Sequence, residues 1–212
     1  MSQGLPPAQG LYDPVNEHDA CGVGFVAHIK GNKSHGIIRQ GLTILERLTH
    51  RGAVGADPKA GDGAGILLQL PNDFFQAVAE CDLPAEGDYA VGMLFLPQNE
   101  TDRNACEAVI TQIIEAEGQT ILGWRDVPVD NSGLGESVIP TEPFIRQVFI
   151  GKGDNDVGQD AFERKLFVTR KQIDHAVRNS NIAEQGYFYI PSMSSRVLVY
   201  KGMLLSDQVG EY

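Results

Sequence analysis

Residues 18–29 carry the run HDACGVGFVAHI, in which a cysteine is followed by alternating side chains. Every second residue from Val23 to Ile29 is apolar, and such alternation is typical of a half-buried β-strand. The pattern therefore predicts a strand from Gly22 to Ile29, with Cys21 at its start.

Residues 1–20, which precede this strand, have the composition of a flexible leader, rich in proline, glycine and acidic residues. They lack the basic start and the apolar centre of a signal peptide. If the leader is removed, Cys21 carries both a thiol and a free α-amine. An α-amine has a pKa of about 7.7–8.0, so it can accept the thiol proton near neutral pH and activate a nucleophile for acyl transfer. The alternative is a small buried cysteine, because free cysteine is among the most buried residue types.

The composition excludes several classes of partner. With 212 residues, 42% of them hydrophobic and 21% charged, the chain can bury the core of a globular domain. Its formal net charge of −11 argues against a nucleic-acid partner, which would need a basic surface, and against docking on anionic lipid. No segment approaches the roughly 20 apolar residues of a membrane span.

The three cysteines Cys21, Cys81 and Cys106 form no CxxC pair and leave an odd count. This usage fits a reducing compartment and argues against a disulfide scaffold or a cysteine zinc site, so we expect a cytoplasmic protein without a bound metal. Cys81 and Cys106 have small apolar neighbours and are interpreted as packing residues. A histidine could also activate a thiol, but His28 is too far along an extended chain to touch Cys21.

Apolar periodicity divides the chain into interleaved helices and strands without an internal repeat. The predicted helices span 34–49, 72–80, 101–117 and 160–178, and a long loop is predicted over 128–143. Further strands are predicted over 66–70, 89–96, 121–127, 144–150, 187–190 and 197–200. Hairpin-like neighbours indicate a mixed α and β fold rather than a regular parallel repeat.

Residues 61–65 read GDGAG and invite a phosphate-binding interpretation. Their spacing is GxGxG rather than GxGxxG, and they precede a predicted strand where a dinucleotide-binding loop should follow one. The run GNKS at 31–34 likewise lacks the spacing of a P-loop. The glycines of 52–65 are better explained by a tight loop that needs close backbone approach or a positive φ.

Residues 48–57 read LTHRGAVGAD and lead from a predicted helix into this loop. Arg51 and the small residues after it would suit guanidinium and backbone donors that face an anion or a developing oxyanion. The alternative, which the residues alone favour, is a helix C-terminus neutralised by His50 and Arg51, with Gly52 as a left-handed cap.

Three runs together resemble a known family: CGVGF at 21–25, HRGAVGAD at 50–57 and GDGAGI at 61–66. They are similar to the class II glutamine amidotransferase domain that opens the large subunit of glutamate synthases. The similarity continues to SRVLVYKGM at 195–203. The Cys-Gly opening and the His-Arg-Gly run are shared across class II amidotransferases, whereas the continuations look specific to the glutamate synthase type.

The resemblance implies an α+β fold of the N-terminal nucleophile (Ntn) hydrolase type, a four-layer αββα sandwich. It also implies that residues 1–20 are a propeptide cleaved between Ala20 and Cys21. Cys21 would attack the amide of L-glutamine, release ammonia and leave a glutamyl thioester that water hydrolyses. Arg51 and Gly52, which the His-Arg-Gly match carries over, would help to bind the substrate.

For the whole enzyme, the resemblance implies that ammonia passes to synthase domains of the same polypeptide, where 2-oxoglutarate becomes L-glutamate. It implies no cofactor in this segment, and FMN and an iron–sulfur cluster elsewhere in the enzyme. A small electron-donating subunit would be a further partner.

The family's later motifs, of the QRFSTN and HNGE type, carry its oxyanion-hole Asn-Gly and its arginine for the glutamine carboxylate. Neither motif occurs before the chain ends at Tyr212. We therefore expect residues 21–212 to be the N-terminal portion of the amidotransferase domain, with its C-terminal part missing and without glutaminase activity alone. Two other functions stay open: a stand-alone N-terminal-cysteine amide hydrolase, and a non-catalytic regulatory domain of the same fold.

Overall fold

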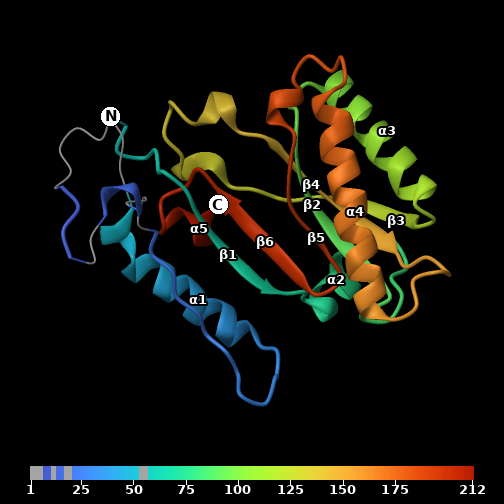
Figure 1. The fold of residues 1–212 in the computed structure, drawn as a ribbon, viewed down its shortest axis with the longest axis horizontal. Coiled ribbons are helices and arrows are strands. Elements are labelled where there is room, and N and C mark those ends of the chain that lie inside the picture. Colours follow the sequence, from blue (N-terminus) through green and yellow to red (C-terminus); the bar gives the residue numbers. More distant parts are fainter. Residues whose placement is uncertain (1–6, 11–12, 17–20, 53–56) are drawn as a thin grey trace.

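The computed structural model describes residues 7–10, 13–16, 21–52 and 57–212, which form interleaved helices and strands (Figure 1). The α-helices are α1 (His35–Arg47), α2 (Asn72–Val78), α3 (Glu100–Ala116), α4 (Gln159–Arg178) and α5 (Gln208–Glu211). The strands are β1 (Ala64–Gln69), β2 (Tyr89–Leu96), β3 (Thr120–Asp126), β4 (Phe144–Gly151), β5 (Tyr189–Ser194) and β6 (Val197–Gly202). All strand pairs are antiparallel, which confirms the mixed α and β prediction. Within the described ranges, no helix has the length and apolar character needed to cross a bilayer.

A four-stranded sheet forms the centre of the molecule, in the order β3-β4-β2-β5. The two inner strands, β2 and β4, are mostly buried because both faces of the sheet are covered, and this explains the uninterrupted apolar run of β2. Helices α3 and α4 lie side by side over one face (Figure 1). The core beneath them includes the fully buried side chains of Leu94, Ile110, Ile114, Phe162 and Leu166.

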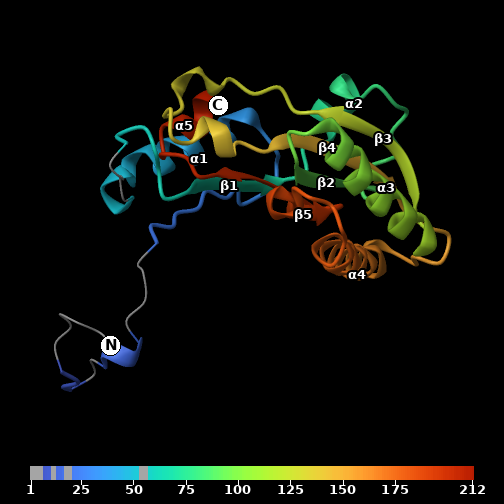
Figure 2. The same ribbon diagram turned by 90° about the horizontal axis from the view of Figure 1, so that it is seen from above.

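The opposite face of this sheet packs against α2 and against a second sheet, made of β1 and β6. Figure 2 shows α2 and α4 on opposite sides of the central strands. The core between the two sheets includes Leu70, Phe75, Tyr89, Phe149 and Leu198. The rings of Phe75 and Phe149 meet edge to face with their centroids 5.4 Å apart, which is a geometry that aromatic pairs prefer.

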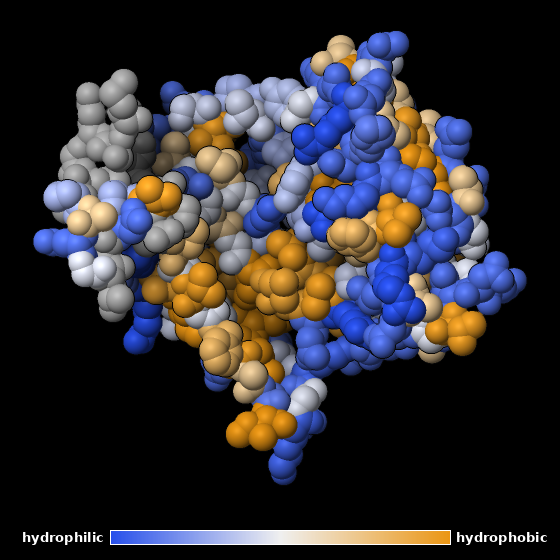
Figure 3. Space-filling view, viewed as in Figure 1, coloured by the Kyte–Doolittle hydropathy of each residue, from blue (hydrophilic) through white to orange (hydrophobic). Residues whose placement is uncertain are grey.

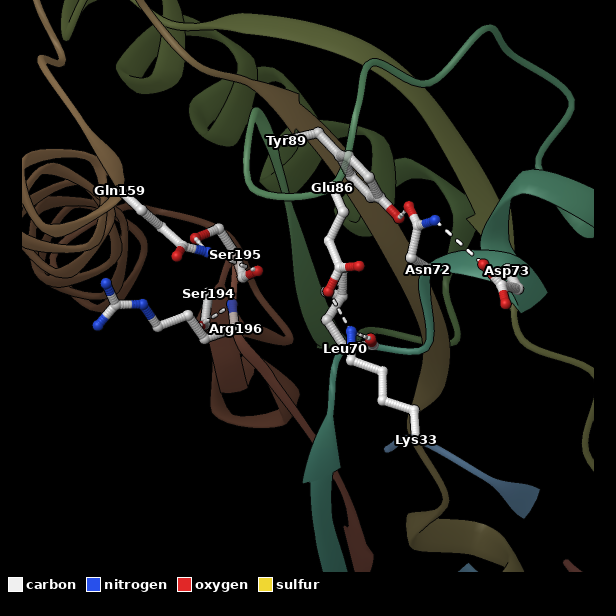
Figure 4. Close-up of polar contacts among 10 residues, drawn as sticks. All are labelled: Lys33, Leu70, Asn72, Asp73, Glu86, Tyr89, Gln159, Ser194, Ser195 and Arg196. Carbon is white, nitrogen blue, oxygen red and sulfur yellow. Dashed lines mark hydrogen bonds and ion pairs between the residues drawn. The ribbon is translucent and has the colours of Figure 1, made fainter. Parts of the chain in front are cut away.

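A carboxylate on α4 fixes the turn that joins the two sheets. Glu163 accepts hydrogen bonds from the Ser194 hydroxyl at 2.9 Å and from the amide and hydroxyl of Ser195 at 2.6 Å each. The Gln159 amide also donates to the Ser195 hydroxyl at 3.2 Å (Figure 4). Since β5 ends at this turn and β6 begins after it, α4 sets the position of the second sheet relative to the first.

The predicted strand from Gly22 to Ile29 is wrong. Residues 21–28 belong to no sheet, and the side chains of Val23 and Phe25 are 85% and 89% exposed. Alternating apolar residues indicate a segment with one apolar face, but a strand also needs a neighbour that pairs with its backbone N–H and C=O groups. In the described part of the chain no strand lies beside this segment, which runs along α1 instead.

The strand predicted over 187–190 is wrong at both ends, because β5 begins at Tyr189, after a 3-10 turn, and continues to Ser194. Pro191 and the serines after it resemble a turn in composition. The structure accommodates them because β5 is an edge strand, where proline is tolerated. The buried hydroxyl of Ser192 accepts a hydrogen bond from the Val199 amide at 3.1 Å, so its polarity costs little in the strand.

Candidate active site

Cys21 lies on the surface, directly before a segment that lines a large groove. Its side chain is exposed, so the interpretation of this residue as a small buried cysteine is wrong. Residues 22–26 line one side of the groove, which has a volume of about 1160 Å³. Hydrophobic side chains gather on this face of the molecule, over α1, β1 and β6 (Figure 3). Cys21 therefore directly precedes, in the chain, the residues that line a space large enough for a small amide substrate.

The groove exists because α1 keeps its apolar face open. No residue of this helix is fully buried. The helix instead approaches β1 at Gly41, where a Cβ atom would lie 3.1 Å from Cδ1 of Ile66. The face predicted from sequence is the face that lines the groove: Ile37, Gly41, Ile44, Leu45 and Leu48.

Two glycines bring the segment after Cys21 against the C-terminal half of α1. A Cβ atom on Gly24 would lie 2.4 Å from Cγ2 of Ile44, and one on Gly22 would lie 3.1 Å from Cβ of Arg51. The segment therefore begins beside Arg51 and runs antiparallel to the helix. In this way the structure brings the predicted nucleophile and the predicted binding arginine into one neighbourhood.

Lys33 anchors the other end of the same segment to the body of the protein. Its ammonium group donates to the Leu70 carbonyl at 3.2 Å and forms an ion pair with Glu86 (Figure 4). The segment is thus held at one end by Lys33, just before α1, and at the other by the packing of Gly24 on Ile44 and of Gly22 on Arg51.

Gly52 does not act as a left-handed helix cap. Its φ of −86° and ψ of 146° are those of extended backbone, and α1 has already ended at Arg47. The sequence interpretation of a simple capped helix end is therefore wrong at Gly52. A Cβ atom on Gly52 would lie 3.7 Å from Oδ1 of Asp62, so the glycine-rich loop lies beside the Arg51-Gly52 pair.

The glycines of the 61–65 loop serve the purposes predicted for them. A Cβ atom on Gly61 would lie 2.2 Å from the carbonyl oxygen of Leu204, so this position permits close approach of two backbones. Gly63 has a φ of +127°, which side-chain-bearing residues rarely adopt. The loop is therefore fastened against the chain that follows β6.

We expect Gly61→Ala to destabilise the protein by about 2–3 kcal/mol or more, because the added methyl group meets rigid backbone rather than a side chain that can rotate away. The matched control is Gly186→Ala, since a Cβ atom there would meet nothing within 4 Å. Denaturant unfolding of the two variants and the parent provides the measurement. Equal unfolding midpoints for both variants would contradict the packing shown here.

Cys81 and Cys106 are packing residues, as predicted. The Cys106 side chain is fully buried in the core under α3, and this burial raises the pKa of its thiol to about 11. Cys81 is half-buried, and burial also raises the pKa of its thiol. Of the three thiols, that of Cys21 is the most exposed.

The described residues offer no evident metal site, since no group of three or more His, Cys, Asp and Glu side chains clusters among them. His28, the histidine considered as a partner for the thiol, accepts a hydrogen bond from the Asn32 amide at 3.3 Å. Among the described residues, therefore, no cluster for a metal is evident, and His28 contacts Asn32 through its ring.

Sequence reasoning missed a set of contacts behind the glycine-rich loop. Asp57, which closes the HRGAVGAD run, accepts a hydrogen bond from the Ser137 hydroxyl at 2.6 Å. Gln208 donates to the carbonyl oxygens of both Lys59 and Gly133. No sequence signal could have found these contacts, because they join residues far apart in the chain and each has at least one partner in an irregular loop.

The family described as glutamine amidotransferases class-II matches residues 21–212, so the match begins at Cys21. Over 98% of its length, the chain is 47% identical to "Glutamate synthase [NADPH] large chain" of Bacillus subtilis. It is 43% identical over 98% of its length to "Glutamate synthase [NADH]" of Schizosaccharomyces pombe, and 40% identical over 97% to "Ferredoxin-dependent glutamate synthase 1, chloroplastic/mitochondrial" of Arabidopsis thaliana.

The chain spans 14%, 10% and 13% of the length of these three relatives, respectively. The family match itself covers the two sheets, the helices and the groove beside Cys21. On this basis the chain belongs to the class II glutamine amidotransferases.

Proposed function

We propose that this chain is the glutaminase part of a glutamate synthase, with Cys21 as the nucleophile that releases ammonia from L-glutamine. The observation that carries the proposal is the place of Cys21: it is exposed, it is the first residue of the family match, and the next residue, Gly22, lines the groove and lies against Arg51. The similarity to three glutamate synthases supports this function over a stand-alone amide hydrolase or a regulatory domain.

The proposed reaction starts after residues 1–20 have been removed. The freed α-amine of Cys21 takes the thiol proton, and the sulfur attacks the side-chain amide carbon of glutamine. The C–N bond then breaks, the α-ammonium returns its proton to the leaving nitrogen, and ammonia departs from a glutamyl thioester. Water hydrolyses the thioester, which releases glutamate and regenerates the thiol. Arg51 and Gly52 would hold the substrate through charged and backbone donors.

The finer fold assignment is part of the same proposal. The arrangement of α3 and α4, the central sheet, the β1–β6 sheet and α1 is compatible with the four-layer αββα sandwich of an N-terminal nucleophile hydrolase. In that fold the nucleophile stands at the N-terminus of the mature chain. This supports a propeptide over residues 1–20 and an amidotransferase portion over 21–212.

For the whole enzyme we propose that the ammonia is passed to synthase domains of the same polypeptide, which convert 2-oxoglutarate into glutamate. FMN and an iron–sulfur cluster would serve those domains. The described residues do not fit such a cluster, since Cys21 is exposed and Cys106 buried in the core and no metal-binding group gathers among them. A cytoplasmic location and a small electron-donating subunit complete the proposal. The names of the relatives specify NADPH, NADH and ferredoxin, so the electron donor stays open.

We predict that the mature protein begins at Cys21 and that a diazoketone analogue of glutamine alkylates its sulfur. The reason is that the thiol needs a free amine as its base and the analogue places its reactive carbon where the amide carbon binds. Peptide mass spectrometry of the labelled, natively expressed enzyme should find one modified peptide that starts at Cys21. A fully active enzyme that retains residues 1–20 would refute this mechanism, because the nitrogen of Cys21 would then be an amide.

A further inference from the structure

Asp57 ends the HRGAVGAD run, but the proposed chemistry gives it no task. Its Oδ2 atom accepts hydrogen bonds from the hydroxyl of Ser137 at 2.6 Å and from the Ser137 amide at 3.3 Å. Its Oδ1 atom accepts one from the Lys59 amide at 2.9 Å. A Cβ atom on Gly135 would lie 2.3 Å from Oδ2, so the carboxylate occupies space that only a glycine leaves open.

A carboxylate suits this position because donors converge on both of its oxygens. These hydrogen bonds lower the pKa of Asp57, and the bond from the Ser137 hydroxyl has the largest effect. The carboxylate is therefore ionised at neutral pH. Asparagine has the same shape but offers one acceptor oxygen, and its amide nitrogen would face a donor. The contact with Ser137 also joins residues that lie 80 positions apart in the chain.

A second side chain fastens the same loop from another direction. Gln208 donates to the carbonyl oxygens of Lys59 at 3.1 Å and Gly133 at 3.0 Å, and it accepts from the Leu205 amide at 2.8 Å. Together with the close packing of Gly61 on Leu204, these bonds hold loop 57–63 between the 130–138 segment and the chain after β6.

The held loop bears directly on the candidate site, because Asp62 lies beside Gly52. Arg51, which precedes Gly52, lies against Gly22 and so next to the nucleophile. We propose that Asp57 is a positioning residue of the glutamine site, which fastens loop 57–63 to the 130–138 segment and thereby fixes Arg51-Gly52 relative to Cys21. This inference rests on the proposed glutaminase function.

The test compares two rates of alkylation of Cys21 in the intact enzyme. Iodoacetamide needs only a reactive thiolate, whereas a diazoketone analogue of glutamine also needs an ordered substrate site. For Asp57→Asn and for Ser137→Ala we expect the analogue to react roughly tenfold more slowly, the size expected for losing a hydrogen bond to a charged group. The iodoacetamide rate and the ammonia-dependent activity should stay within about twofold of the parent, since neither needs the glutamine site.

Asp130→Asn is the matched control. Asp130 lies in the same 130–138 segment and also accepts a bond from a serine amide, that of Ser132 at 3.0 Å, but this contact is local. We expect both rates in this variant to equal those of the parent. Ser137→Thr, which keeps the hydroxyl, should restore most of the analogue rate that Ser137→Ala loses.

Two results would overturn the inference while leaving the proposed function in place. One is an analogue rate in Asp57→Asn equal to that of the parent. The other is an equal fall of both rates in Asp57→Asn and Ser137→Ala, because the contact would then support the fold as a whole. If the parent enzyme itself is not labelled at Cys21 by the analogue, the proposed function fails, and this inference falls with it.

Discussion

Cys21→Ser in the intact enzyme should abolish glutamine-dependent formation of glutamate, while activity with added ammonia survives. A hydroxyl has a far higher pKa than a thiol, so the same α-amine cannot generate the nucleophile. Loss of the nucleophile costs another covalent hydrolase about 10⁶ in kcat, and we expect a fall of at least roughly 10³-fold here. The measurement compares the two activities of one purified variant.

Cys106→Ala provides the contrast. Because the Cys106 side chain is fully buried in the core and does not line the groove, the substitution should cost about 1 kcal/mol of stability and leave the glutamine-dependent rate near that of the parent. If Cys21→Ser lost its ammonia-dependent activity to the same extent as its glutamine-dependent activity, Cys21 would be a structural residue and the proposed mechanism would be wrong.

Elements whose burial comes from their own apolar pattern could be predicted from the sequence. The bounds of β2 were predicted as observed, and those of α3 and α4 to within about one residue, because a covered strand is apolar throughout and a covered helix is apolar along one stripe. Cys106, Ile110 and Ile114 follow the four-residue spacing of such a stripe and are buried in α3.

Prediction failed where the structure depends on a partner that the local sequence does not contain. Gly22–Ile29 has the alternation of a strand but no pairing neighbour in the described residues. Conversely, Ser192 and Ser194 look like a turn, yet they complete β5 because an amide of β6 and a carboxylate of α4 satisfy their hydroxyls. Local pattern gives a propensity, and pairing decides whether it is realised.

The candidate site shows the same division. Cys21 and Arg51 belong to sequence runs that could be recognised, but the packing of Gly22 on the Arg51 side chain could not, since only the path of the chain along α1 creates it. The hydrogen bond between Asp57 and Ser137 could not be predicted either, because irregular loops carry no periodicity from which to infer a contact.

Arg51→Ala should lower kcat/KM for glutamine by roughly 10–10²-fold, the range expected for losing a charged hydrogen bond to a substrate. Arg51→Lys should recover part of this loss, because an ammonium group keeps the charge but not the planar fork that binds a carboxylate or an oxyanion at two points. Steady-state kinetics with glutamine, beside kinetics with ammonia, provide the measurement.

Arg47→Ala is the matched control. Arg47 is the basic residue in the last turn of α1, and it is exposed, as Arg51 is. If Arg51 served only to neutralise the helix end, both substitutions would cost the same few tenths to about 1 kcal/mol of stability and neither would change catalysis. A loss of kcat/KM for glutamine in Arg51→Ala alone, with ammonia-dependent activity retained, assigns the guanidinium to the substrate. Equal kinetics in the two variants would instead show that Arg51 only neutralises the helix end and that other residues bind glutamine.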